Sequence, residues 1–75
     1  MMEEIQIETE FIRLDALLKL TGLVDTGGQA KAAIQQGMVQ VNGESCLMRG
    51  KKMRPGDTLT AGGRSFLIAQ AKESE

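Results

Sequence analysis

The sequence predicts an α+β domain in which two packed helices are followed by a small twisted antiparallel sheet. Three observations predict this fold. Apolar residues recur at helical spacing in the first half of the 75-residue chain, and apolar and polar residues alternate in the second half. The pairs Asn42-Gly43 and Gly62-Gly63 separate alternating segments, as the tight turns of hairpins do. The chain has no internal repeat and no linker, so we expect one small domain.

The two ends of the chain are acidic and are expected to lie outside the main domain. Residues 1–10 contain four glutamates, and Ile5 and Ile7 alternate there with polar residues, which predicts an acidic arm or a short first strand. Residues 70–75 end in Glu-Ser-Glu and predict a disordered tail. The domain itself is then expected over residues 11–69.

The first helix is predicted by its apolar spacing. It begins at Arg13, and Gly22 ends it. One face of this helix carries the residues at i, i+3, i+4 and i+7, which are Leu14, Leu17, Leu18 and Thr21.

The second helix has a start signal and a stop signal. Thr26 and Gln29 fit the capping box that begins a helix. Gly37 stands where the helix should end, because glycine adopts the left-handed conformation without steric cost. Its inward face is expected to carry Ala30, Ala33 and Ile34.

The rest of the chain is predicted to form the sheet. Residues 38–41 alternate as a strand, and residues 44–48 are expected to return as its hairpin partner. A final hairpin is expected from 58–61 and 64–69. Its core face would carry Leu59, Phe66 and Ile68.

The charge is unevenly distributed. The net charge of the chain is −1, yet residues 11–72 hold nine Lys/Arg against four Asp/Glu, a local net of +5. This excess favours a polyanionic partner, because an exposed charge acts over roughly one Debye length of ~8–10 Å. Four of the cations fall within six residues, at Arg49, Lys51, Lys52 and Arg54.

This basic segment is expected to project from the sheet edge as a unit and to contact phosphates. Stacking of bases on aromatic rings is not expected, because neither Phe11 nor Phe66 stands in a basic, exposed sequence context. The segment therefore favours recognition of the shape and backbone of a folded nucleic acid.

Residues 26–31, TGGQAK, allow two interpretations. The free N–H groups at a helix start attract phosphate, Gly27 and Gly28 would leave them open, and Lys31 would add a charge. Alternatively, the glycines only make a tight turn between the helices. The residues alone do not separate the two.

Several classes of function are disfavoured. The chain has no histidine and a single cysteine, so it lacks an imidazole base, a histidine-containing metal site and the usual partner of a catalytic thiol. We expect no enzyme, no cofactor and no metal. Cys46 is expected to be a packing residue, and no apolar segment reaches the ~20 residues of a membrane span. We expect a cytoplasmic monomer.

Together these residues resemble a known family. The segments RLDALLKLTGL, AKAAIQQGMVQVNG and RPGD are similar to the RNA-binding domain named after the small-subunit ribosomal protein S-four, over residues 11–69. The resemblance implies the αL RNA-binding motif, with structured RNA lying across the helix pair and the adjoining loop. Small bacterial members of about this length are the most similar.

The resemblance also implies roles for residues. Arg13 corresponds to the arginine that opens the first helix and faces RNA, and Thr26 to the serine that caps the second. Relatives commonly carry arginine where this chain has Gly27, so one phosphate contact is missing. The expected RNA-binding residues are Arg13, Thr26, Gly27, Gly28, Lys31, Asn42, Arg49, Lys51, Lys52 and Arg54.

The resulting hypothesis is a non-catalytic protein that binds folded ribosomal or transfer RNA through its phosphate backbone and is associated with the ribosome. Ribosomal proteins are further candidate partners. Two alternatives remain open at this point. Two helices joined by a glycine turn also fit a helix-turn-helix DNA binder, and the acidic ends fit a protein-interaction module with weak RNA affinity.

Overall fold

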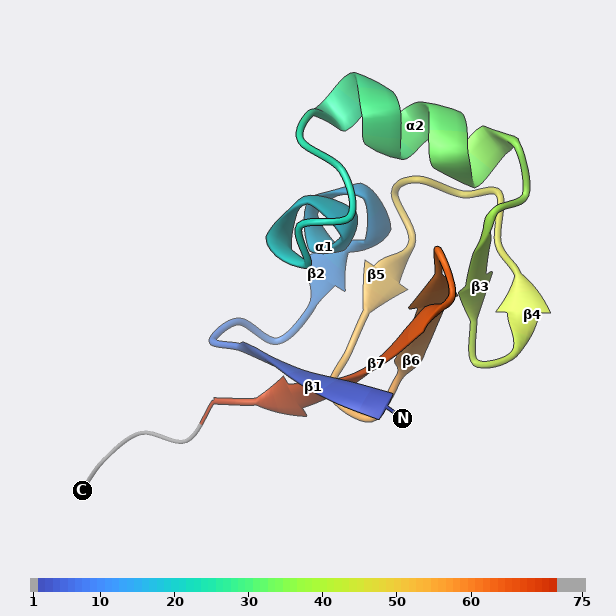
Figure 1. Cartoon of the computed structure of the whole chain (residues 1–75). Coiled ribbons are helices and arrows are strands. Elements are labelled where there is room, and N and C mark those ends of the chain that lie inside the picture. The colour runs from blue at the N-terminus through green and yellow to red at the C-terminus, as the bar shows by residue number, and fades with distance from the viewer. Residues whose placement is uncertain (1, 72–75) are drawn as a thin grey trace.

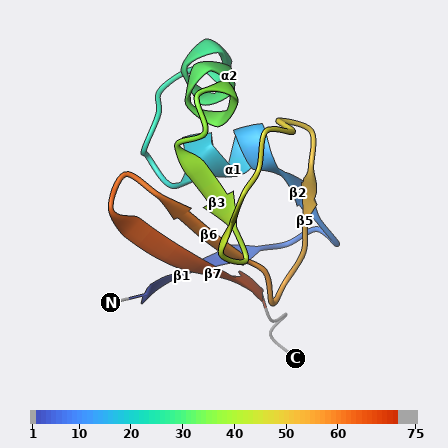
Figure 2. The ribbon, with the colours of Figure 1, turned by 90° about the vertical axis from the view of Figure 1, so that its right-hand side faces the viewer.

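Two helices lie together on one side of a twisted sheet (Figures 1 and 2). The structure is a computed structural model, and it describes residues 2–71. Its elements in chain order are β1 Met2–Ile7, β2 Ile12–Arg13, α1 Leu14–Leu20, α2 Gly27–Gln35, β3 Val39–Val41, β4 Glu44–Ser45, β5 Lys52–Met53, β6 Thr58–Ala61 and β7 Arg64–Gln70.

The α+β class is confirmed, but the sheet is mixed rather than wholly antiparallel. Its strand order is β1-β7-β6-β3-β4, and every pair is antiparallel except β1 with β7. Residues 8–57 separate β1 from the final hairpin, so no tight turn forces β1 to run against β7. Six residues of β1 pair with β7, and Ile7 is buried.

The core lies between the helices and one face of the sheet. Both helices bury the faces that their sequences predict, and the inner side chains of β3, β6 and β7 meet them. The buried residues are Ile7, Leu14, Leu17, Leu18, Ala30, Ile34, Val39, Val41, Met53, Leu59, Ala61, Phe66 and Ile68.

The ends of α2 follow the predicted signals. The Thr26 hydroxyl accepts the Gln29 N–H at 3.1 Å, and the Gln29 side-chain oxygen accepts the Asp25 N–H at 2.7 Å. At the other end Gly37 has φ +76°, and the N–H groups of Gly37 and Met38 donate to the carbonyls of the last helical turn. The position of the helix is therefore set by local sequence.

Both predicted hairpin turns are present. Asn42 and Gly43 have φ values of +53° and +86°, and Gly62 and Gly63 have +61° and +77°, as type I′ turns require. The strand after the first turn is shorter than predicted. β4 covers Glu44–Ser45 rather than residues 44–48, and the chain then leaves the sheet.

The basic segment does not project from the sheet edge, as its sequence predicts. Lys52 and Met53 form β5, which pairs with β2 directly before α1. The Leu14 N–H donates to the Lys51 carbonyl at 2.9 Å, and the Asp15 N–H donates to the Arg49 carbonyl at 3.1 Å. The segment thereby satisfies N–H groups that the first helical turn leaves without partners, while Met53 is buried.

The end of the chain is ordered further than predicted. Gln70 belongs to β7, and the Ala71 N–H donates to the Ile7 carbonyl at 2.8 Å. The predicted disordered tail otherwise falls on residues 72–75, which lie outside the described residues. Neither described helix is long and apolar enough to cross a membrane.

Candidate nucleic-acid interface

The two-stranded ribbon of β2 and β5 presents one aromatic ring and three cations on its outer side. Ile12 pairs with Met53 and Arg13 pairs with Lys52. Met53 is buried and Ile12 packs against the core, so alternation turns their neighbours outward. We call the outward residues the ribbon face; they are Phe11, Arg13, Lys52 and Arg54, and all four are exposed.

The environment of Phe11 corrects the expectation that no aromatic ring stands among exposed cations. Its side chain is 37% exposed. The Lys52 ammonium lies 5.0 Å from the centre of the ring, and the Arg54 guanidinium carbon lies 6.0 Å from it. Lys52 and Arg54 are some forty residues away along the chain, so the sequence around Phe11 does not indicate them. Pairing of β2 with β5 brings them there.

Arg13 is held in place by a neighbouring acid. One guanidinium nitrogen of Arg13 lies 3.2 Å from Asp15, whose other carboxylate oxygen accepts the Ala16 N–H at 2.8 Å. The Arg13 side chain remains 55% exposed. Its other N–H groups can therefore still donate to a phosphate, and an arginine can do so with two bonds at once.

A shallow groove of about 260 Å³ joins the starts of the two helices. It is lined by Arg13, Asp15, Ala16, Lys19 and Gly27. Lys19 was not among the predicted site residues. Lys19 stands four residues after Asp15, so the two lie on the same exposed face of α1, away from the leucines. This spacing is the sequence signal that could have indicated Lys19.

The start of α2 borders this groove. Gly27 and Gly28 do not have positive φ values. A Cβ at Gly27 would meet nothing within 4 Å, and one at Gly28 would make an ordinary 3.8 Å contact with Thr26. The fold thus does not require glycine at either position, although the first-turn N–H groups are accessible there. Lys31 lies one turn after Gly27 and on the same side of the helix.

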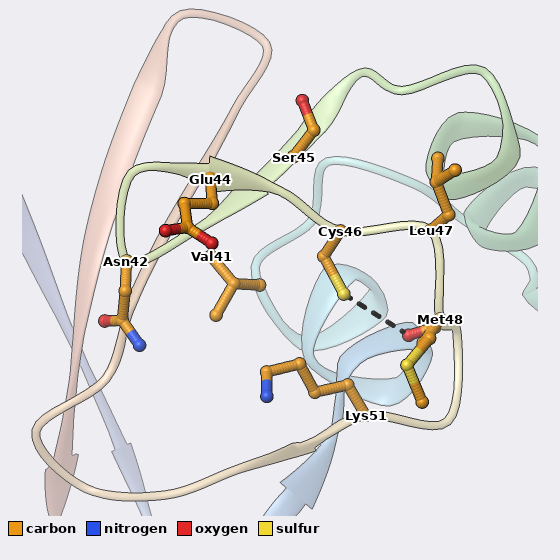
Figure 3. A pocket seen from close by; sticks show the side chains of 8 residues that line it. All are labelled: Val41, Asn42, Glu44, Ser45, Cys46, Leu47, Met48 and Lys51. Carbon is orange, nitrogen blue, oxygen red and sulfur yellow. Dashed lines mark hydrogen bonds between the residues drawn. The ribbon is translucent and has the colours of Figure 1, made fainter.

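Lys51 and Asn42 lie apart from both the ribbon face and the groove between the helix starts. Lys51 is half-buried and lines a different pocket, of about 390 Å³, together with Asn42 and Cys46 (Figure 3). The Asn42 side chain accepts the Thr58 N–H at 2.9 Å and donates to Asp57 at 3.2 Å. It therefore ties the first hairpin turn to the start of β6.

Charge pairing leaves most of the basic residues uncompensated. Within residues 2–71, ion pairs join Arg13 to Asp15 and Arg64 to Glu3, and none involves Lys19, Lys52 or Arg54. Arg64 donates two hydrogen bonds of 2.8 Å to Glu3, and these bonds lower the pKa of Glu3. No group of three metal-ligating side chains is found in this part of the chain.

Comparison with known proteins shows the family of this chain. The sequence pattern of the S4 domain matches residues 5–69. The chain belongs to the S4 domain family. The match begins within β1, in the segment that the sequence alone predicts to be an acidic arm or a short first strand.

Two relatives of this S4 domain protein carry descriptive names. A protein of Bacillus subtilis, called a probable ribosome maturation protein RlbA, is 39% identical over 59 residues, covering 79% of this chain and 83% of the relative. The solution structure of YbcJ from E. coli is described as revealing an αL motif involved in RNA binding. It superimposes with a TM-score of 0.69 at 31% identity, covering 92% of this chain and 89% of YbcJ.

Proposed function

We propose that this S4 domain protein is a non-catalytic RNA-binding protein that recognises folded ribosomal or transfer RNA through its phosphate backbone. The observation that carries the proposal is the continuity of the ribbon face with the groove between the helix starts. Arg13 belongs to both, so the cations of β5 and the open start of α2 adjoin one another.

The proposed mechanism combines fixed and mobile donors. Arg13 is oriented by Asp15 and binds a phosphate with its remaining N–H groups. Lys19, Lys52 and Arg54 neutralise neighbouring phosphates from flexible, exposed side chains. The free N–H groups at the start of α2 donate to a further phosphate oxygen, which can approach closely at Gly27. Such contacts follow the path of a folded backbone and do not read base edges.

The names of the two relatives support RNA as the ligand and the ribosome as its setting. The description of YbcJ names RNA binding, and the name of RlbA names ribosome maturation. We therefore propose that this chain acts as a monomer on ribosomal RNA in the bacterial cytoplasm, with ribosomal proteins as neighbours. Transfer RNA shares the same backbone chemistry and is the second candidate.

The proposal is tested by titrating the protein into fluorescently labelled ribosomal RNA hairpins, transfer RNA and duplex DNA, each at several salt concentrations. With about five phosphate contacts, the slope of log affinity against log salt should lie on the order of −3 to −5. Structured RNA should bind more tightly than duplex DNA of equal charge. Equal binding of both, or an affinity that ignores salt, would contradict the proposal.

A further inference from the structure

We infer that Phe11 is a stacking platform for one unpaired nucleobase at the edge of the bound RNA. This inference rests on the proposed function and extends it, because backbone contacts alone do not distinguish a paired from an unpaired region. A stacked base would direct the protein to a bulged nucleotide in an RNA stem.

Phe11 is exposed on the ribbon face. The chain has two phenylalanines. Phe66 is 2% exposed and fills the core, whereas Phe11 is 37% exposed. The alternation that turns Ile12 toward the core turns Phe11 outward, onto the same side as Arg13. The fold therefore displays this ring on the ribbon face.

Two cations lie over the Phe11 ring. Lys52 and Arg54 approach Phe11 to 5.0 and 6.0 Å, and neither forms an ion pair with another described residue. Both side chains are long and exposed, so they can move from the ring to the phosphates that flank a stacked base. The two cations lie over the ring, so a stacking base takes their place on its face. Aromatic rings combined with cations that contact the backbone bind single-stranded nucleic acid in this way.

An unpaired base fits the Phe11 ring better than a paired base or a phosphate does. Bases inside a duplex have both faces covered by their neighbours, whereas an unpaired base can present a face to an aromatic side chain. The ring of Phe11 offers a phosphate neither a hydrogen-bond donor nor a positive charge. A nucleobase is uncharged and can stack on the ring.

The chain offers a direct optical test, because it contains no tryptophan and no tyrosine. The variant Phe11→Trp places a single fluorophore at the proposed platform. Three probes share one RNA stem: a fully paired hairpin, the hairpin with one bulged adenosine, and the same bulge without its base. Emission should fall with the bulged adenosine and change much less with the other two probes. Met2→Trp, on an exposed side chain at the start of β1, is the matched control and should not respond.

The affinity test uses Phe11→Leu. This variant should bind the bulged hairpin about tenfold more weakly, the paired hairpin with unchanged affinity, and both with an unchanged salt slope. If Phe11→Leu weakens both hairpins equally, or the tryptophan does not report the bulge while RNA binds normally, stacking is refuted and the proposed function stands. If the wild-type chain binds neither hairpin nor ribosomal RNA, both are refuted.

Discussion

At the scale of single residues, adjacent lysines have different surroundings. Lys52 faces outward opposite Arg13, whereas Lys51 is half-buried beside Asn42 and Cys46 (Figure 3). Lys51 directly precedes β5 and Lys52 begins it, and successive residues of an extended segment point to opposite sides. The run of four cations in the sequence therefore does not share one face of the protein.

This difference makes a matched pair of variants. Lys52→Gln should weaken RNA binding and reduce the magnitude of the salt slope by about one, because one phosphate contact is lost. Lys51→Gln removes the same charge and should leave the slope nearly unchanged. Titrations at several salt concentrations measure both. Equal slopes for the two variants would mean that net charge, rather than the ribbon face, governs binding.

At the scale of elements, α2 has clear start and stop residues, but its first turn contains two glycines, which have low helix propensity. Thr26 caps the helix, and Gly37 ends it with a positive φ. Gly27 and Gly28 follow the cap without any backbone or steric requirement for glycine. Stability gains nothing from these glycines, which is consistent with a role in approach of a ligand.

The variant Gly27→Ala tests whether Gly27 lowers the stability of the helix while raising the affinity for RNA. The substitution should raise the free energy of unfolding by about 0.5 kcal/mol, because alanine loses less chain entropy on folding. It should also lower RNA affinity about fivefold, the equivalent of one net hydrogen bond. Urea unfolding and RNA titration measure the two effects.

Gly28→Ala is the control, since Gly28 does not line the groove. It should stabilise the helix similarly and leave RNA affinity almost unchanged. A Gly27→Ala variant that gains stability and keeps full affinity would show that no phosphate approaches this turn.

Also at the scale of elements, an ion pair supports the pairing of β1 with β7. The bidentate contact between Arg64 and Glu3 joins the two strands near the start of β1. Arg64 lowers the pKa of Glu3 below the ordinary value of 4.5. Deprotonated Glu3 thus stabilises the fold at pH values above 4.5, and that contribution disappears as the pH falls through the lowered pKa.

Glu3→Gln should therefore lower the melting temperature slightly at neutral pH and not at the acidic end of the range. The wild-type and variant curves of melting temperature against pH should converge once Glu3 is protonated. Glu4→Gln, which changes a neighbouring carboxylate without an ion pair, is the control. A difference that stays constant with pH would assign the effect to packing.

At the scale of the whole molecule, the fold keeps part of the acidic N-terminal segment away from the ribbon face. The sequence has a net charge of −1. β1, which carries Glu3 and Glu4, pairs with β7 at one edge of the main sheet, whereas the ribbon forms a separate small sheet beside α1 (Figure 2). Arg64 neutralises part of the acidic strand. The protein can therefore present a basic surface to RNA despite its overall negative charge.

The features that depend on neighbours along the chain could be predicted from the sequence. The caps of α2, the two type I′ turns and the inward faces of both helices were predicted, because each depends on a few adjacent residues. The tertiary structure alone decided the ribbon of β2 and β5. Each of these strands has two residues, too few for a periodic signal, and they pair across some forty positions because burial of Met53 and the unpartnered N–H groups of α1 favour it. That long-range pairing decides which cations share a face with Arg13, and it places Phe11 among them.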